Sequence, residues 1–363
     1  MSNKISDFQF LTSDFIIVGQ GIAGTLLAHA LMRAGKSVLV IDDHHRGASS
    51  QDAESIINSI TGQRYVKSWR VDDLLPVAKP TYRELENLLG IKIFHPRRIL
   101  RTMANAKEEN DWLGRTAEPG YAPYIADATQ LGTKTKKTQP AFGYGEVLRG
   151  GQVDLPLLIE HFRKYLAKSD AMLDQKFNFD ELEILPEGVR YQNLTAEKII
   201  FCEGANVKQN PFFNYLPLEG NKGQSLIVRI PGAGFEKILK QQVFIVPLAE
   251  RDLYWIGSTY ERQYTDDQPT EQGLRYLHER LAQVLRVPFE VVEHMAAVRP
   301  TVADRRPMLG LHPEFSQLGI FNGLGTKGAS LGPFWAKQLV DFLLHEEPLD
   351  EAVDIQRFES FFE

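Results

Sequence analysis

The chain has 363 residues, 43% hydrophobic and 24% charged, a composition typical of a globular protein long enough for two hydrophobic cores. Its formal net charge of -6 argues against nucleic-acid binding as the main function, because phosphate contacts need clustered Lys and Arg. The single cysteine, Cys202, excludes an internal disulfide and a cysteine-based metal site, and the nine histidines form no compact metal-binding pattern.

The sequence has no pattern typical of a secretory signal or of a transmembrane segment. The N-terminal segment lacks a charged region followed by an apolar one, so we expect no secretory signal. No uninterrupted apolar stretch is long enough to span a bilayer, so we expect no transmembrane segment. These observations predict a cytoplasmic protein.

The strongest motif occupies residues 14–42. An apolar run at 15–18 leads into a Gly-x-Gly-x-x-Gly turn, a helical stretch follows, and a second apolar run at 38–41 ends on Asp42. This order of strand, glycine turn, helix, strand and acid is that of the dinucleotide-binding unit. The segment therefore predicts a nucleotide cofactor.

Each position of this motif has a physical role. Gly19 permits the tight turn, Gly21 lets the backbone approach a pyrophosphate, and Gly24 lets the helix pack on the strand. The helix N-terminus presents free N–H groups and a positive dipole end to the phosphates. The carboxylate of Asp42 is placed to accept hydrogen bonds from the adenosine ribose. The candidate cofactor residues of this segment are Gly19, Gly21, Ile22, Ala23, Gly24, Asp42 and Asp43.

The middle of the chain alternates helical and extended patterns. Residues 66–90 have apolar residues at helical spacing and end on Gly90, and residues 91–103 indicate a strand broken by proline. Residues 105–140 are polar and rich in Gly, Thr and Lys, which predicts an irregular or hairpin-like segment. An amphipathic helix is predicted after Asp154, which is a suitable N-cap.

The second half begins with another apolar strand, at 199–206, which stops at Gly204. Strand patterns dominate residues 223–260, and a helix is predicted at 270–286. A last strand leads into a helix that is opened by glycines near residue 328. Nucleotide-type elements thus alternate with β-rich segments, which predicts two domains that are discontinuous in sequence.

Eight segments together resemble one known family in their order and spacing. They are GQGIAG…VLVID at 19–42, GASS at 47–50, GGQVDLPLL at 150–158, IIFCEGAN at 199–206, GNKGQSLIVR at 220–229, YWIGSTYE at 254–261, VRPTVADRRPMLG at 298–310 and NGLGTKGASLGP at 322–333. With these marks the chain resembles the D-amino-acid-oxidase-like family of FAD-dependent oxidoreductases, the group of glycine oxidase and sarcosine oxidase.

The resemblance implies an α/β fold in which a Rossmann-type FAD-binding domain is combined with a discontinuous β-rich (α+β) substrate domain. The FAD-binding domain is expected at 1–90, 141–215 and 296–363, and the substrate domain at 91–140 and 216–295. It also implies FAD rather than NAD. A covalent link to the flavin is not expected, because Cys202 lies on the 199–206 strand rather than in the final segment. Non-covalent FAD is therefore predicted.

Further cofactor residues follow from the resemblance. Ser49 and Ser50 would lie near the pyrophosphate and the flavin, and Gly204 would close the second nucleotide-side strand. The pyrimidine edge of the flavin would be faced by Gly325, Thr326, Lys327 and Gly328. Lys327 would add positive charge to a helix N-terminus there and so help to stabilise reduced flavin. The alternative for Lys327 is an exposed loop lysine.

The substrate residues also follow from the resemblance. Arg299 matches the arginine that clamps a substrate carboxylate, a task for which its forked donors are suited. A surface position, or an ion pair with Asp304, is the alternative. Phe244, Trp255 and Tyr260 are predicted to line the substrate site, with core packing as the alternative role. Two departures leave the substrate open: Phe244 stands where relatives carry Tyr, and Glu203 replaces a small residue.

The predicted function is oxidation of the C–N bond of a small amino or imino acid by hydride transfer to FAD, with oxygen or a quinone as electron acceptor. Such a reaction requires no general base, since the hydride leaves a neutral amine. One alternative is a 2-hydroxy-acid or polyol-phosphate dehydrogenase, which needs a base such as His294 near the flavin. A tRNA wobble-base aminomethyl oxidoreductase is disfavoured by the acidic charge, and a non-catalytic FAD scaffold remains open. The oligomeric state is left undetermined, and no nucleic-acid partner is predicted.

Overall fold

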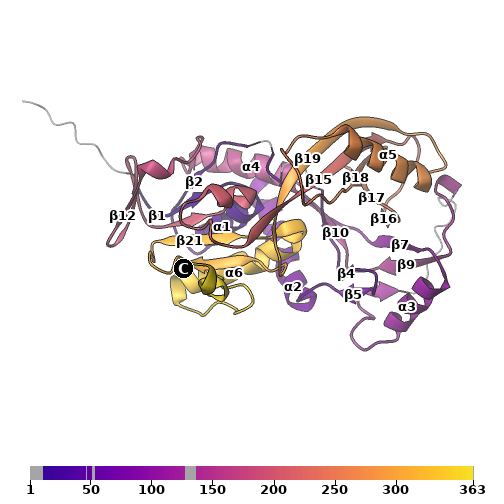
Figure 1. Cartoon of the computed structure of the whole chain (residues 1–363), viewed down its shortest axis with the longest axis horizontal. Helices are drawn as coiled ribbons and strands as arrows, with labels where there is room; N and C mark the ends of the chain where they lie inside the picture. The colour runs from indigo at the N-terminus through magenta and orange to yellow at the C-terminus, as the bar shows by residue number, and fades with distance from the viewer. Residues whose placement is uncertain (1–10, 46, 51–53, 127–135, 363) are drawn as a thin grey trace, which may run out of the picture. The chain divides into compact units, whose positions relative to one another are not determined.

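The computed structural model describes residues 11–45, 47–50, 54–126 and 136–362, and the chain forms two compact units (Figure 1). Unit 1 comprises Met1–Ser50, Leu158–Gly220 and Pro300–Glu363, and unit 2 comprises Gln51–Leu157 and Asn221–Arg299. Both units are therefore discontinuous in sequence.

The compact units differ from the predicted domain boundaries: residues 51–90, 141–157 and 296–299 join unit 2, and residues 216–220 join unit 1. The reason is long-range pairing. Strand β10 (Gly151–Asp154) pairs antiparallel with β3 (Glu54–Ile57) and β6 (Phe94–Pro96), and helix α2 (Val71–Leu89) contacts β6. A sequence pattern does not reveal such partners.

Unit 1 is built on a mostly parallel sheet. Its central strands are β2 (Val38–Ile41), β1 (Leu11–Val18), β14 (Leu194–Phe201) and β21 (Leu318–Asn322), which are hydrogen-bonded in that order and run parallel. The outer strands are β11 (Met172–Leu173), β12 (Leu182–Leu185), β13 (Gly188–Tyr191) and β20 (Met308–Leu311). The unit's helices α1 (Ile22–Arg33) and α6 (Gly328–His345) contact each other, as Figure 1 shows. The predicted Rossmann-type α/β fold is confirmed.

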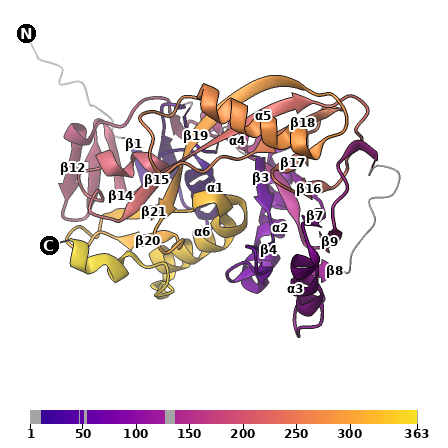
Figure 2. The ribbon, with the colours of Figure 1, turned by 45° about the vertical axis from the view of Figure 1, so that its right-hand side comes forward.

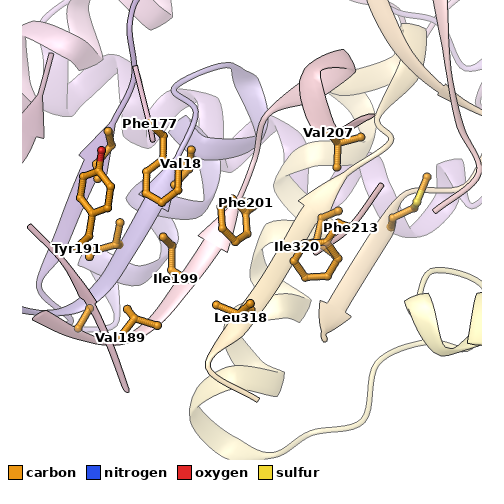
Figure 3. Packing of buried hydrophobic residues seen from close by; sticks show 14 of the residues in the cluster. Val18, Phe177, Val189, Tyr191, Ile199, Phe201, Val207, Phe213, Leu318 and Ile320 are labelled. Atoms are coloured by element: carbon orange, nitrogen blue, oxygen red, sulfur yellow. The ribbon is translucent and has the colours of Figure 1, made fainter. Parts of the chain in front are cut away.

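The hydrophobic core of unit 1 is rich in aromatic side chains, and Figure 3 shows Phe177, Tyr191, Phe201 and Phe213 among them. Phe177 stacks on Tyr191 with ring centroids 4.4 Å apart, and its edge meets the ring of Phe201. The last four residues of β1 are all buried, as expected for a strand covered on both faces. This packing fixes the carboxyl ends of β1, β14 and β21, where the candidate cofactor residues lie.

Unit 2 contains an eight-stranded sheet with one long helix, α5 (Glu271–Val284), against it (Figure 2). The strands, in their spatial order, are β19 (Glu290–Val302), β15 (Leu218–Arg229), β18 (Leu253–Gly257), β17 (Phe244–Pro247), β16 (Ile238–Lys240), β7 (Ile99–Met103), β9 (Gly143–Val147) and β8 (Ile125–Ala126). The helix α4 (Leu155–Lys168), together with β15 and β19, crosses the boundary between the units. The short hairpin of unit 2 consists of β4 (Ile60–Thr61) and β5 (Val66–Lys67).

Alternation along the strands gives this sheet two chemically different faces. On one face, Leu226, Tyr254 and Ile256 form a core with Leu277 and Leu281 of α5. The next residues along each strand point the other way. We call this opposite face the second face; it carries the side chains of Arg101, Lys240, Phe244 and Trp255 and the Cα hydrogens of Gly223 and Gly257.

The prediction of an irregular or hairpin-like segment at 105–140 is wrong in part. Residues 105–140 contain helix α3 (Ala106–Thr116), whose N-cap Asn105 accepts a hydrogen bond from the backbone N–H of Glu108. The helix is fixed by Trp112, which is fully buried. Because the rest of the helix is mostly polar, the sequence pattern gave no sign that the single side chain of Trp112 anchors it. Residues 127–135 of the segment lie outside the described part of the chain.

The other predicted elements are confirmed, except that residues 66–67 of the helix predicted at 66–90 form strand β5 and the helix begins at Val71. Helix α2 ends before Gly90, which adopts a left-handed conformation (φ 66°), and Asp154 accepts a hydrogen bond from the N–H of Leu157 as an N-cap does. Helix α5 coincides with the predicted helix at 270–286 to within two residues. Within the described ranges, no helix combines the length and the apolar character needed to cross a bilayer.

Candidate functional site

The glycine turn after β1 lies at the carboxyl edge of the unit 1 sheet. Gly19 has φ +99° and donates its N–H to the carbonyl of Ile41 at 2.9 Å. A Cβ there would lie 2.6 Å from the carbonyl oxygen of Cys202, and a Cβ on Gly24 would lie 1.9 Å from that of Gly19. Side chains at these two positions would therefore force the ends of β1, β14 and α1 apart.

The N-terminus of α1 is open to an anionic ligand. Its N-cap, Gly21, supplies no capping side chain, and a Cβ there would meet only the hydroxyl of Ser50 at 3.4 Å. Ser50 accepts a hydrogen bond from the N–H of Ile22 at 3.1 Å. Among the described residues, no side chain caps this helix end through the N–H groups of Ala23 or Gly24, which leaves them for a ligand.

Asp42 ends β2 and is held rigidly beside the glycine turn. Its Oδ2 accepts from the N–H of Gln20 at 2.8 Å, and its Oδ1 accepts from the N–H of His44 at 2.8 Å and from Arg163 at 2.7 Å. Because Oδ2 accepts only one of these bonds, it can accept another from a ribose hydroxyl. The neighbouring Asp43 is exposed.

Arg163 on α4 is a residue that sequence reasoning missed. Its guanidinium also donates to the carbonyl oxygen of Asp42 at 2.9 Å and to Asp174 at 2.8 Å. It therefore sets the angle of the Asp42 carboxylate. Nothing in an amphipathic helix pattern distinguishes such an arginine from a solvated one, so only the fold reveals it.

The final glycine segment lies next to the first. A Cβ on Gly328 would come within 3.2 Å of the Ile22 side chain, and one on Gly332 within 2.5 Å of Leu26. The N-termini of α1 and α6 are thus neighbours, although they are far apart in sequence. Gly325, Thr326 and Lys327 form a short 3₁₀ turn immediately before α6.

Lys327 is half-buried and Thr326 is exposed. Burial lowers the pKa of Lys327, and the nearby Arg305 and Arg306 lower it further. A lysine in such a position gains from a negatively charged neighbour. The predicted role of Lys327 toward an anionic ligand is consistent with this environment.

Asn322, the last residue of β21, is hydrogen-bonded to Gly204, which follows the end of β14. The side-chain amide of Asn322 donates to the carbonyl of Gly204 at 2.9 Å, and its oxygen accepts from the N–H of Gly323 at 2.8 Å. Asn322 is 2% exposed. It holds the ends of β14 and β21 together, and sequence reasoning did not single it out.

Glu203 lies beside the same edge, next to the backbone of Gly19. Its carboxylate accepts a hydrogen bond from the amide of Asn210 at 2.7 Å. Burial raises the pKa of Glu203 to about 7, and the hydrogen bond opposes this only in part. Glu203 is therefore the acid of this edge whose charge changes near neutral pH.

A pH-dependent stability follows for Glu203. Its pKa is raised from 4.5 to about 7 by folding, so the folded state binds the extra proton and stability falls as pH rises through that interval. We expect Glu203→Gln to be more stable than the unsubstituted protein at pH 8 by about 1 kcal/mol or more, and to lose this advantage at pH 5. Thermal unfolding of both proteins at the two pH values measures it; equal differences at both would contradict the assignment.

The predicted substrate residues of unit 2 gather on the second face. Arg299 is half-buried, and its Nη1 donates to Oδ1 of Asn221 and to the carbonyl of Thr259, both at 3.3 Å. Its guanidinium lies directly over Gly223, where a Cβ would come within 1.9 Å of Nη2. Gly223 therefore makes room for the arginine head. No ion pair with Asp304 is found within the described residues; Asp304 pairs with Arg357 instead.

Of the predicted aromatic residues, Phe244 and Trp255 lie on the second face at Gly257, and Tyr260 lies near Arg299. The Trp255 ring covers Gly257, and Phe244 is paired with Gly257 across β17 and β18. Burial of the guanidinium lowers the pKa of Arg299, and the nearby Tyr260, which is 52% exposed, opposes this only in part. Asn221 is a further residue that the sequence did not single out.

His294 does not share this face. Along a strand, residues an odd number of positions apart point to opposite sides, so His294 and Arg299 of β19 are expected on different faces. Burial and the charge of Lys222 lower the pKa of His294. This placement weakens the alternative reaction that requires a histidine base beside the substrate.

Two other observations bear on where ligands bind. A pocket of about 630 Å³ is lined by the start of β1 and by residues 185–189, and it lies at the amino edge of the unit 1 sheet. Ligands of such sheets bind at the carboxyl edge, so this pocket is not the cofactor site. Across the described ranges, no group of three or more His, Cys, Asp or Glu side chains is placed to hold a metal ion.

Comparison with known proteins gives consistent matches. Residues 14–342 match the family described as FAD dependent oxidoreductase. The bifunctional protein ThiO/ThiG of Trichormus variabilis is 25% identical over 96% of this chain, which spans only 56% of that relative. Glycine oxidase of Pseudomonas aeruginosa is 25% identical, with 92% of this chain and 95% of the relative covered. The crystal structure of glycine oxidase from Geobacillus kaustophilus superposes with a TM-score of 0.80 at 21% identity, covering 96% of this chain and 98% of that one.

Proposed function

The chain belongs to the family of FAD dependent oxidoreductases, and on this basis we propose that it oxidises the C–N bond of a small amino or imino acid whose carboxylate is bound by Arg299. The observation that carries the choice of substrate is the Arg299 guanidinium, which lies over Gly223 on the second face. One relative and one solved structure similar to this chain bear the name glycine oxidase, which favours the same substrate class.

The residues of unit 1 fit FAD. The uncapped N-terminus of α1 offers N–H groups to the pyrophosphate, and Asp42 offers a carboxylate oxygen to the ribose. The glycines at 325 and 328 leave the turn before α6 small enough for a close approach. When bound, FAD supplies the acceptor for the hydride that leaves the carbon of the C–N bond.

The residues of unit 2 orient the substrate. The forked donors of Arg299 suit a carboxylate because they fix both its position and its angle. Asn221 and Thr259 hold the guanidinium over Gly223. Phe244, Trp255 and Tyr260 provide aromatic surface beside it. No side-chain base is required, because a neutral amine loses its hydride directly and the electron pair on nitrogen forms the C=N bond.

An anaerobic substrate panel tests this proposal. Glycine, sarcosine, alanine, proline and their amide derivatives would be mixed with the holoenzyme beside matched 2-hydroxy acids, and bleaching of the flavin would be followed. We expect bleaching by amino or imino acids that have a free carboxylate. Bleaching by hydroxy acids alone, or equal bleaching by amides and acids, would overturn the assignment. The electron acceptor, oxygen or a quinone, and the cytoplasmic location remain predictions.

The cofactor is expected to be non-covalent. Cys202, the single cysteine, directly follows β14 and is 4% exposed, and burial raises the pKa of its thiol well above the usual value. A buried protonated thiol is a poor nucleophile for attachment to a flavin. Acid precipitation of the purified yellow protein should release FAD into the supernatant. Flavin that stays in the pellet, or NAD in its place, would contradict the prediction.

A further inference from the structure

Two more cations lie on the second face beside Phe244. Phe244 is paired with Lys240 of β16, and Lys240 is paired with Arg101 of β7. Residues that pair in register point to the same face of a sheet, so these two basic side chains are neighbours. They lie on the second face, which carries Trp255 and over which the Arg299 guanidinium lies.

Aromatic rings hold both cationic heads. The Nζ of Lys240 lies 4.5 Å from the centroid of the Phe244 ring, and the guanidinium of Arg101 lies 4.6 Å from that of Tyr65. Arg101 also donates to the carbonyl of Gly62 at 2.9 Å. Cation–π contacts of this kind position a cation without neutralising it.

The pair has no counter-ion of its own in the part of the chain that the structure describes. No carboxylate forms an ion pair with Lys240 or Arg101 there. Glu108, whose charge acts on Arg101 from a distance, accepts a hydrogen bond from the N–H of Ala104 at 2.9 Å. Burial lowers the pKa of Lys240 to about 8, and the charge of Arg101 contributes.

Two like charges opposite each other on a partly buried sheet face are unfavourable. Chance placement of cations on a surface does not explain why neither Lys240 nor Arg101 is paired with an acid in the described part of the chain. An anionic ligand would convert the pair into a favourable arrangement, since each head can donate a charge-assisted hydrogen bond to it.

The spacing to Arg299 indicates the size of that ligand. The guanidinium of Arg299 lies over β15, and the ammonium of Lys240 lies over Phe244 of β17, with β18 between them. Two strand spacings of about 4.8 Å and a shift of roughly two residues along the strands give a separation on the order of 12 Å. After hydrogen bonds of about 2.8 Å at each end, two acid groups separated by roughly two or three atoms fit between the cations.

We infer that Lys240 and Arg101 form a second anion subsite, so that the substrate is an amino or imino acid with two acid groups, one bound by Arg299 and the other by this pair. This inference rests on the proposed function and narrows its substrate class. The Trp255 ring, which covers Gly257 of β18, lies between the two anchoring positions and forms the floor under the substrate carbon chain, and the Phe244 ring lies under the ammonium of Lys240.

The test uses the holoenzyme with matched mono- and diacids. Anaerobic flavin reduction would be compared for sarcosine against N-(carboxymethyl)glycine and for alanine against glutamate, in both enantiomers. Binding of glutarate, a diacid without an amine, would be measured by calorimetry. We expect lower KM values for the diacids, and measurable binding of glutarate that Lys240→Met weakens about ten- to hundredfold.

The variants separate a binding role from a structural one. Lys240→Met should raise the KM for the diacid far more than the KM for sarcosine, and Lys240→Arg should restore most of the diacid binding. Arg251→Met removes a cation that is 91% exposed in the turn between β17 and β18, and should change neither. Retained flavin absorbance and melting temperature would show that Lys240→Met folds.

The outcomes distinguish this inference from the proposed function. Equal glutarate binding by the unsubstituted protein and Lys240→Met, or no preference for diacids over monoacids, would overturn the second subsite. Glutarate binding that depends on Lys240, in an enzyme whose flavin no amine reduces, would instead support the subsite and refute the amino-acid oxidation.

Discussion

We expect the Arg299→Lys variant to retain FAD but to reduce it on the order of a hundred times more slowly with the best amino-acid substrate. Lysine keeps the positive charge and loses the forked donors, so the carboxylate is held at one point and can rotate. Stopped-flow bleaching of the flavin under anaerobic conditions measures the rate. The flavin spectrum before mixing measures cofactor content.

The structure supplies a second way to displace the same group. A Cβ on Gly223 would lie 1.9 Å from Nη2 of Arg299, so Gly223→Ala should move the guanidinium without removing any charge. We expect a comparable loss of rate. Arg229→Lys is the matched control, because Arg229 lies on β15, the strand of Gly223, and pairs with the exposed Glu250. If both Arg299→Lys and Gly223→Ala reduced their flavin as fast as the unsubstituted protein does, the role of Arg299 would be structural. A substrate without a carboxylate would then be favoured.

The second large effect is expected at Asp42, where Asp42→Ala should weaken FAD binding by about 1.5–3 kcal/mol, or roughly ten- to more than a hundredfold. Its carboxylate is fixed by Gln20, His44 and Arg163, and it has capacity to accept a ribose hydroxyl. The flavin ring is not its partner, so reduction of the FAD that remains bound should be little changed. Equilibrium titration of apoprotein with FAD measures the loss.

Asp174→Ala is the control for this effect. Asp174 is 74% exposed and shares Arg163 with Asp42, so its removal perturbs the arginine while leaving the Asp42 carboxylate in place. We expect it to keep nearly normal FAD affinity. Equal losses in Asp174→Ala and Asp42→Ala would mean that the Arg163 network, and not contact with the ribose, explains the result. Normal FAD binding by Asp42→Ala would refute the ribose assignment.

The cofactor half of the site was the part most open to prediction from sequence. Gly19, Gly24 and Asp42 act within one strand–helix–strand unit, where the required spacing is local and its physical reasons are known. Arg163, which orients Asp42 from a distant helix, carries no local signal. The partner of Gly204 is likewise visible only after β14 and β21 have been paired.

What the sequence determined by itself was the dinucleotide-binding unit, the family resemblance and most helices and strands, because glycine spacing and hydrophobic period are properties of neighbouring residues. Tertiary structure alone decided the extent of the two units, since the pairing of β10 with β3 and β6 joins segments far apart in sequence. It also decided which cations share a face. Arg299, Lys240 and Arg101 come from three separate strands, and the order and register of the sheet bring them to one side. No sequence period records that order, because it is set by long-range hydrogen bonding between strands.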